Sequence, residues 1–125
     1  IRISFLRFLR MQIGKYTAIC RGVDIRTPYR ISIGSYTTIN KHVVLDGRGG
    51  IVIGNCVDIA QDVNIWSLQH DYNSPAYATK GGKVIIEDYV WLASRVTVLP
   101  GNPAKVIGKR EDCLKYKLGQ RGWFR

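Results

Sequence analysis

The stretch IGKYTAI at residues 13–19 returns twenty residues later as IGSYTTI at 33–39, and again as IGNCVDI at 53–59. Self-similarity at a fixed period is the signature of a repeat architecture, in which each repeat is one structural unit stacked on the next. Within and beyond these blocks, aliphatic residues recur every six positions, and twelve residues obey that rule: Ile13, Ile19, Ile25, Ile33, Ile39, Leu45, Ile53, Ile59, Ile65, Ile86, Leu92 and Val98.

A period of six fits neither the 3.6 residues of a helical turn nor the simple alternation of an exposed strand. Three short strands that form one triangular coil produce such a period, because each aliphatic rung stacks under its equivalent in the next coil. The pattern therefore predicts a parallel β-helix with a narrow core. A second column of mostly small or β-branched residues is expected to point inward as well: Thr17, Val23, Thr37, Val43, Gly49, Val57, Val63, Val90 and Val96.

The spacing also predicts where the coils turn. Twenty residues are three sixes plus two, and we expect the two extra residues to bulge out near 30–32 and 50–52. The glycines at 14, 34 and 54 follow a rung at a corner and are expected to adopt backbone angles that other residues avoid. Residues 68–82 exceed the repeat by about 13 residues, are polar and turn-rich, and are predicted to leave the prism as a loop.

Length and composition favour one soluble domain. The chain has 125 residues, of which 46% are hydrophobic, enough to build a core. We expect a β-helix over 13–101, a cap over 1–12 and a cap or tail over 102–125. No stretch approaches the roughly 18 apolar residues of a membrane span, and arginines interrupt the opening segment, so a cytoplasmic location is expected. Three scattered cysteines suggest neither a disulfide framework nor a zinc knuckle.

The net charge of +10 favours partners that carry negative charge, such as phosphates, acidic glycans, nucleic acid or anionic lipids. The basic residues are scattered between strands instead of being interleaved with aromatic residues on one face, so no nucleic-acid partner is expected. In a helical segment 1–12, four apolar side chains would lie opposite Ser4, Arg7 and Arg10: Phe5, Leu6, Phe8 and Leu9. Capping the open end of the coils is the favoured role, and contact with an anionic membrane is the alternative.

The chain resembles the hexapeptide-repeat acyltransferases, and residues 53–101 resemble their sugar O-acetyltransferase branch, which includes the galactoside, maltose and polysaccharide acetyltransferases. The resemblance is carried by IGNCVDIAQDVNIWSLQHD, VIIEDYVWLASRVTVLPG and the late GNPAKVIGKR. It implies a left-handed β-helix, a homotrimer, acetyl-CoA as the cosubstrate and transfer of an acetyl group to a sugar hydroxyl of a glycan or polysaccharide precursor.

The sequence departs from the family at one point. In the family, VLPG is followed by about one and a half further coils before NPAK, whereas here Gly101 runs directly into Asn102. The absent stretch holds part of the donor wall in the family. This departure motivates an alternative function, a catalytically silent scaffold that binds a glycan or a partner.

His70 is the candidate catalytic residue, because it stands at the base of the predicted loop and matches the family's catalytic histidine. An acceptor hydroxyl is a poor nucleophile near neutral pH, and a neutral imidazole can take its proton as the oxygen attacks a thioester. The alternative is a histidine that only caps a loop.

The resemblance also implies a donor site. Trp91, followed by Ala93 and Ser94, is expected to wall the acyl pocket. The late basic segment matches the family's contact with the phosphates of coenzyme A, through Lys105, Lys109 and Arg110. A solvated tail is the alternative for these cations, and burial at a subunit interface is the alternative for Trp91.

Four residues are candidates for acceptor binding. Trp66 is predicted to point outward, where it could face a sugar ring or lie in a subunit interface. Asp46 and Asn64 could bind hydroxyls, although an Asx turn is slightly favoured for Asp46. His42 lies on a different face from His70, so it could help to place an acceptor across a trimer or simply lie on the surface. With two histidines in the chain, a zinc site of three histidines is not expected.

Overall fold

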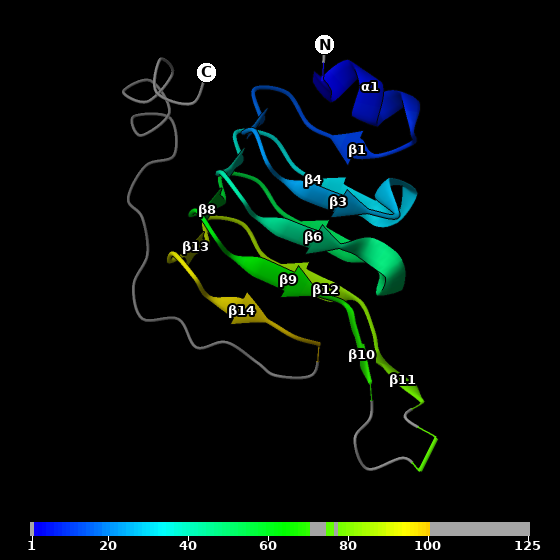
Figure 1. Cartoon of the computed structure of the whole chain (residues 1–125). Coiled ribbons are helices and arrows are strands. Elements are labelled where there is room, and N and C mark those ends of the chain that lie inside the picture. The colour runs from blue at the N-terminus through cyan, green and yellow to red at the C-terminus, as the bar shows by residue number, and fades with distance from the viewer. Residues whose placement is uncertain (1, 71–74, 77, 101–125) are drawn as a thin grey trace.

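The structure is a computed structural model that describes residues 2–70, 75–76 and 78–100 (Figure 1). It is a left-handed parallel β-helix, in which short strands wind into four stacked coils of three strands each. A helix, α1 (Arg2–Phe8), lies over one end of the stack, and a hairpin projects beyond the other end. The fold class, the amino-terminal helical cap and the protruding segment predicted from the sequence are confirmed.

The coils present three faces, which we name A, B and C. Face A contains β1 (Gln12–Ile13), β4 (Ile31–Ile33), β7 (Ile51–Ile53) and β12 (Val84–Ile86). Face B contains β2 (Ala18–Ile19), β5 (Thr38–Ile39), β8 (Asp58–Ile59) and β13 (Trp91–Leu92). Face C contains β3 (Asp24–Arg26), β6 (Val44–Asp46), β9 (Asn64–Trp66) and β14 (Thr97–Val98). Equivalent strands of neighbouring coils pair in parallel on every face.

The strand register fixes the length of each coil. Between coils two and three, paired residues lie 20 positions apart, as Ile33 and Ile53 do. Between coils three and four the separation is 33 positions, as for Ile53 and Ile86. The last turn is therefore longer by 13 residues, which confirms the inserted segment that the rung spacing predicts.

The predicted rungs make the core. Eight of the twelve belong to one buried hydrophobic cluster and the other four pack against it, and those of the two middle coils are almost completely buried. The second column also points inward, with Val43, Val57 and Val63 fully buried. Where this column holds a threonine, the hydroxyl is satisfied: Thr37 Oγ1 donates to the carbonyl of Gly54 in the next coil at 2.8 Å.

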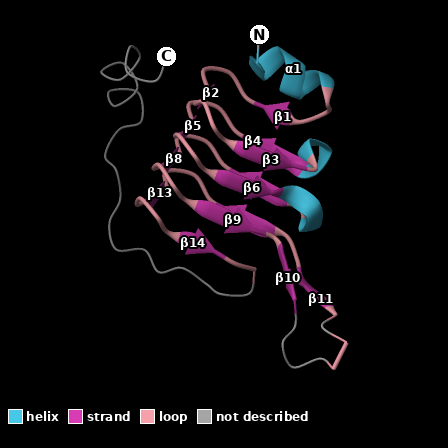
Figure 2. Cartoon of the chain, in the orientation of Figure 1, coloured by secondary structure: helices cyan, strands magenta, loops and turns pink. Residues whose placement is uncertain are grey.

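The two extra residues of each twenty-residue coil lie earlier in the chain than predicted. Instead of bulges at 30–32 and 50–52, two short 3₁₀ helices take up the excess at the corner between faces C and A: η1 (Pro28–Arg30) and η2 (Gly47–Gly49) (Figure 2). The residues that follow are strand, and Ile31 and Ile51 are buried in the core. The prediction is wrong because it assumed that each strand of face A points one side chain into the core. Strands β4 and β7 each point two side chains into the core.

The glycines at the corner between faces A and B have a different role from the one predicted. Gly14, Gly34 and Gly54 do not adopt positive φ. Glycine is needed because the next coil lies too close for a Cβ, which at Gly34 would be 2.7 Å from the carbonyl oxygen of Gly54. The left-handed conformation is instead adopted two positions later by larger residues, Tyr16, Tyr36 and Cys56, and by Tyr89 at the equivalent corner of coil four.

Helix α1 closes the amino-terminal end of the core. Leu6 is buried and Ile3 packs against the core, while Met11, just after the helix, is almost fully buried. No helix in the part of the chain that the structure describes is long and apolar enough to cross a membrane. The predicted carboxyl-terminal cap at 102–125 lies outside the described residues.

Candidate functional site

The inserted segment leaves coil three as an antiparallel hairpin (Figure 2). Its arms are β10 (Leu68–His70) and β11 (Thr79–Gly81), with Leu68 opposite Gly81 and His70 opposite Thr79. The segment was predicted as a loop, and its ends are paired strands because the hairpin gives their backbone groups partners away from the prism. The backbone of His70 thus lies in the first arm, at the corner between faces C and A.

Ser67 anchors the root of this hairpin. Its side chain is fully buried; the hydroxyl donates to the carbonyl of Asp46 and accepts from the backbone N–H of Gly49 at 2.7 Å. On the returning arm, the N–H of Gly82 donates to the carbonyl of Ser67 at 3.0 Å, and a Cβ on Gly81 would lie 2.2 Å from that oxygen. The sequence analysis missed Ser67, although a serine just after the coil-three strand and a Gly-Gly pair before the next coil were available signals.

Asp46 and Arg48 form a tightly bonded pair on η2. The carboxylate is completely buried and accepts from Arg48 Nε at 2.8 Å and from Arg48 Nη2 at 2.7 Å. The backbone N–H of Arg48 also donates to it at 3.2 Å, which confirms the Asx turn. The hydrogen bonds from the Arg48 side chain lower the pKa of Asp46, although burial opposes the shift, and the same bonds raise the pKa of Arg48. A contact between Asp46 and an acceptor remains a prediction.

Trp66 stands on the outer surface of face C in the same column as Asp46. The register stacks Arg26, Asp46 and Trp66 in coils one, two and three. The guanidinium carbon of Arg26 lies 5.2 Å from the centre of the Trp66 ring, within the range of a cation–π interaction. Asn64 lies two residues before Trp66 on the same strand and is half-buried. Face C therefore gathers three of the four predicted acceptor residues.

His42 lies at the corner between faces B and C, in the second coil. It is exposed, has a φ of 60°, and its ring lies against Gly22, where a Cβ would be 2.9 Å from Nδ1. The hairpin with His70 leaves from the other edge of face C, so the two histidines arise at different corners of one chain. Among the described residues, no three His, Cys, Asp or Glu side chains come together as a possible metal site.

The predicted donor residues that the structure describes lie in the fourth coil. Trp91 projects outward from face B, with 62% of its surface exposed. Ala93 and Ser94 follow at the corner between faces B and C and are exposed. The basic candidates Lys105, Lys109 and Arg110 lie outside the described residues.

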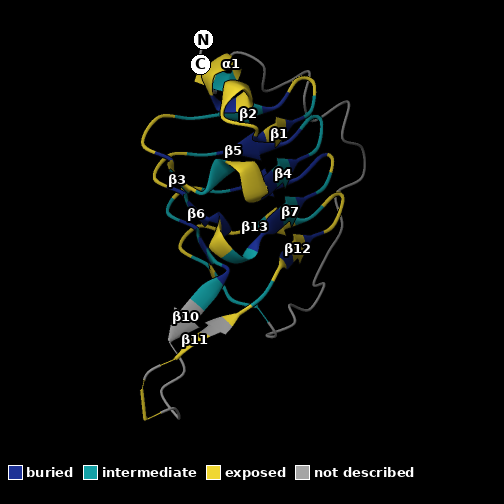
Figure 3. Ribbon diagram, turned by 90° about the vertical axis from the view of Figure 1, so that its right-hand side faces the viewer, coloured by how far each residue is buried: buried dark blue, intermediate teal, exposed yellow. Residues whose placement is uncertain are grey.

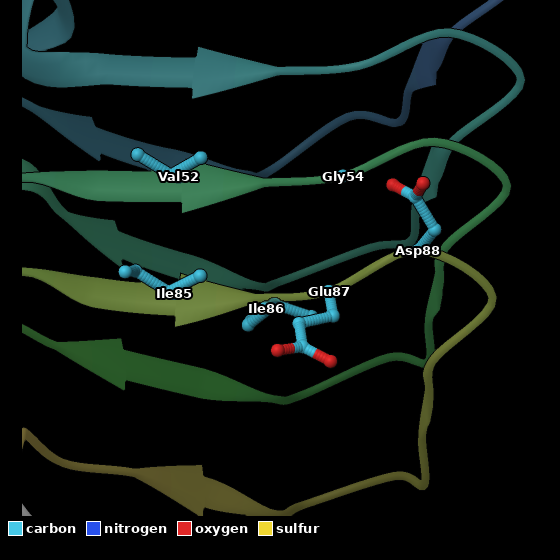
Figure 4. A pocket seen from close by; sticks show the side chains of 6 residues that line it. All are labelled: Val52, Gly54, Ile85, Ile86, Glu87 and Asp88. Atoms are coloured by element: carbon cyan, nitrogen blue, oxygen red, sulfur yellow. The ribbon is translucent and has the colours of Figure 1, made fainter.

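A shallow hollow of about 440 Å³ lies elsewhere, on face A (Figure 4). It is lined by Val52 and Gly54 of coil three and by residues 85–88 of coil four, with the carboxylates of Glu87 and Asp88 at the corner. None of the predicted catalytic, donor-binding or acceptor-binding residues lines it. Because it is open and carries two carboxylates, it is a poor match for the phosphates of coenzyme A.

Sequence comparison identifies relatives among bacterial acetyltransferases. The chain is 30% identical over 117 residues to the predicted colanic acid biosynthesis acetyltransferase WcaF of Escherichia coli K12, and equally similar to WcaF of Shigella flexneri. The match covers 91% of this chain and 64% of each relative. The chain thus spans slightly less than two thirds of the length of these relatives. No protein-family model matches the chain.

Solved structures share its fold. AntD of Bacillus cereus, an N-acyltransferase solved with dTDP and 3-hydroxybutyryl-CoA, superposes with a TM-score of 0.55 and 16% identity, covering 95% of this chain and 94% of AntD. A variant of AntD solved with dTDP and coenzyme A gives a TM-score of 0.60 at 16% identity, with 94% of each chain covered. The chain resembles hexapeptide-repeat acyltransferases in sequence and in fold.

Most of the candidate site residues lie on face C or at its two edges. Face C holds Asn64 and Trp66, with the hairpin of His70 at one edge. His42 and the Ala93–Ser94 corner lie at the opposite edge, in coils two and four. The face therefore separates the predicted base from the predicted donor residues within a single chain.

Proposed function

We propose that the chain is an acyl-CoA dependent O-acetyltransferase that transfers an acetyl group from acetyl-CoA to a sugar hydroxyl. The observation that carries the proposal is the similarity to the WcaF acetyltransferase, which covers 91% of the chain. The acceptor is a glycan or polysaccharide precursor, and the name of WcaF, which refers to colanic acid biosynthesis, supports this substrate class. The enzyme acts in the cytoplasm.

His70 acts as the general base. Its imidazole takes the proton of the acceptor hydroxyl while the oxygen attacks the thioester carbonyl, forming a C–O bond. The tetrahedral intermediate then collapses as the C–S bond breaks, and the proton on the imidazolium passes to the departing sulfur of coenzyme A. Backbone N–H groups stabilise the transient oxyanion. The reaction consumes only acetyl-CoA and the acceptor, and it neither takes up nor releases a net proton or electron.

The acceptor lies on face C. The half-exposed Trp66 supplies a flat apolar surface for a sugar ring, and Asn64 supplies an amide for its hydroxyls. The buried carboxylate of Asp46 contributes indirectly, because it fixes Arg48 beside the hairpin root. His42 reaches an acceptor held by the neighbouring subunit of a homotrimer, which is the assembly that the family resemblance implies.

The donor lies along the fourth coil. Trp91 presents an exposed ring for the pantetheine arm, and the exposed corner Ala93–Ser94 lies next to the exposed Arg95. An exposed cation fits a donor that carries phosphates. The basic residues of the late segment complete the contact with the phosphates: Lys105, Lys109 and Arg110. No metal is required, since the thioester is already activated toward attack.

The decisive experiment measures thiol release from acetyl-CoA in the presence of a panel of nucleotide sugars and oligosaccharides, with mass spectrometry of the acceptor. The expected result is release of one thiol for each acetyl group gained by the acceptor. His70→Ala should lower kcat by about 10²- to 10⁴-fold without changing the melting temperature. His42→Ala is the matched control and should retain kcat, with an effect confined to the KM for the acceptor.

Two results would overturn parts of this proposal. Undiminished turnover by His70→Ala would remove the histidine mechanism. Failure of the intact trimer to release thiol from any acyl donor would instead favour the scaffold alternative, which is motivated by the direct junction of Gly101 and Asn102.

A further inference from the structure

Helix α1 covers the core with one side and exposes apolar side chains on the other. Leu6 is buried beneath the helix, whereas Phe5 is 59% exposed and Phe8 is 82% exposed. Leu9, just after the helix, is also exposed. Figure 3 shows most of α1 coloured as exposed, in contrast to the buried strand β5 of the second coil. Capping the coils therefore accounts for only one side of this amphipathic segment.

The helix is held rigidly in this orientation. The guanidinium of Arg2 donates to the carbonyls of Cys20 and Val23. The guanidinium of Arg7 donates to the carbonyl of Ile13 at 3.0 Å and to that of Gly14 at 3.3 Å. These bonds tie α1 to the first coil at both ends. The two phenylalanines are thus directed away from the core by the fold itself.

Among residues 1–100, the positive charge is concentrated at the same end. Residues 1–45 carry eight basic side chains and only Asp24 as an acidic one, a net charge of +7. Residues 46–100 carry four basic and six acidic side chains, a net charge of −2. Exposed cations in the segment just after α1 and in the first coil include Arg10, Lys15 and Arg21. Within residues 1–100, the net charge is therefore positive at the end of the coils next to α1 and slightly negative at the other end.

Two exposed tyrosines extend this surface in the first coil. Tyr16 lies at the corner between faces A and B, where its ring stacks on Tyr36 with centroids 5.0 Å apart. Tyr29 lies on η1, next to Arg30. Aromatic rings with a polar tip are enriched at the level of lipid headgroups. Apolar, cationic and interfacial aromatic side chains thus coincide at one end of the molecule.

We propose that this end docks on an anionic lipid bilayer, with Phe5, Phe8 and Leu9 in the boundary between headgroups and acyl chains. The exposed cations lie at the level of the lipid phosphates, as in other interfacial amphipathic helices. The positive charge of this end of the molecule favours a negatively charged lipid surface as its partner. A second copy docked end to end would bring two regions of net charge +7 together, which opposes association.

Docking leaves the candidate site accessible. The strand order β1-β4-β7-β12 places α1 and the hairpin at opposite ends of face A, separated by three strand spacings or about 14 Å. In Figure 1 the hairpin points away from α1. The hairpin would accordingly face away from the bilayer. This inference goes beyond acetyl transfer and holds for an enzyme or a scaffold alike.

The test is co-sedimentation of the full chain with vesicles of phosphatidylcholine alone and of phosphatidylcholine mixed with phosphatidylglycerol. Binding is expected only to the mixed vesicles, and high salt should weaken it. The double variant Phe5→Ser/Phe8→Ser should lose at least about tenfold in partitioning. Ile85→Ser is the matched control, because Ile85 is 64% exposed on coil four, and it should bind as the parent chain does.

Three outcomes would overturn the proposal. These are equal binding to neutral and mixed vesicles, no binding to either, and full binding by the double phenylalanine variant. Light scattering tests the alternative, in which this face packs against a second copy of the chain. In that case the double variant would form a smaller oligomer than the parent chain while its vesicle binding stayed unchanged. Circular dichroism of each variant excludes unfolding as the cause, and both phenylalanines are exposed enough to be replaced without loss of the core.

Discussion

Arg48 holds the buried carboxylate of Asp46 through two side-chain hydrogen bonds, one to each oxygen, at 2.8 and 2.7 Å. The pair closes η2 directly beside the hairpin root, because Ser67 bonds both the carbonyl of Asp46 and the N–H of Gly49. One acid on coil two thus supports the position from which the candidate catalytic segment leaves coil three.

The first prediction concerns the pH dependence of stability. Since the pKa of Asp46 is lower in the folded chain than in the unfolded chain, its stabilisation is fully present above the unfolded pKa of about 3.9 and is lost as pH falls through the folded value. Asp46→Asn should therefore melt at a lower temperature than the parent chain at pH 7, and the difference should shrink below about pH 4. Thermal melts from acid to neutral pH test this. A difference that stays constant across that range would contradict the role assigned to ionised Asp46.

The second prediction concerns the anchor of the hairpin. Ser67→Ala removes a buried hydroxyl and leaves the N–H of Gly49 without that acceptor, so the free energy of unfolding should fall by about 1–3 kcal/mol. Ser32→Ala is the matched control, because Ser32 lies on the outer surface of face A, and it should cost less than about 0.5 kcal/mol. Urea denaturation of both variants measures the difference. Equal stability of the two variants would show that Ser67 is not an anchor.

The stacking of the coils was predictable because it depends on a simple rule repeated along the chain. Every aliphatic rung must meet its equivalent in the next coil, so rungs such as Ile39 and Ile59 identify both the period and the core. The length of the insertion follows from the same rule. The extra inward residues Ile31 and Ile51 were missed because a six-residue period does not reveal how the chain is divided at the corner between faces C and A.

The local bonding at the site was less predictable. The Asx turn of Asp46 follows from the sequence LDGRGG. The hydrogen bonds from the Arg48 side chain to the Asp46 carboxylate depend on the conformation of η2 and could not be predicted. The contact of Arg26 with Trp66 joins residues 40 positions apart, in coils that are not adjacent. Such contacts depend on side-chain length and direction, which the repeat does not specify.

The third prediction tests why the corner glycines are required. A Cβ on Gly54 would lie 2.8 Å from the backbone nitrogen of Asp88, so Gly54→Ala should cost about 1–3 kcal/mol. Gly82→Ala is the matched control, because a Cβ there meets no atom within 4 Å and Gly82 does not have positive φ. It should be neutral or stabilise the fold by about 0.5 kcal/mol. Chemical denaturation of both variants measures these values, and a neutral Gly54→Ala would show that the coils can separate at little cost.

The fourth prediction separates the acceptor from the donor. Trp66 lies on face C with the guanidinium of Arg26 over its ring, whereas Trp91 projects from face B of coil four. Trp66→Leu should raise the KM for the acceptor by about tenfold and leave the KM for acetyl-CoA unchanged, because a sugar ring loses its aromatic surface. Trp91→Leu should do the opposite. The two variants control for each other, since both lose one partly exposed indole.

The kinetics of thiol release, with each substrate varied in turn, measure both constants. If both variants raise both KM values equally, the two tryptophans do not divide the substrates between faces C and B, and the assignment of the acceptor to face C would be wrong. If neither variant changes either KM, neither indole contacts a substrate, and analytical ultracentrifugation of the two variants would test whether the indoles lie in subunit interfaces instead. The opposite changes expected for the two substrates depend on faces B and C binding different molecules, which a general loss of stability cannot imitate.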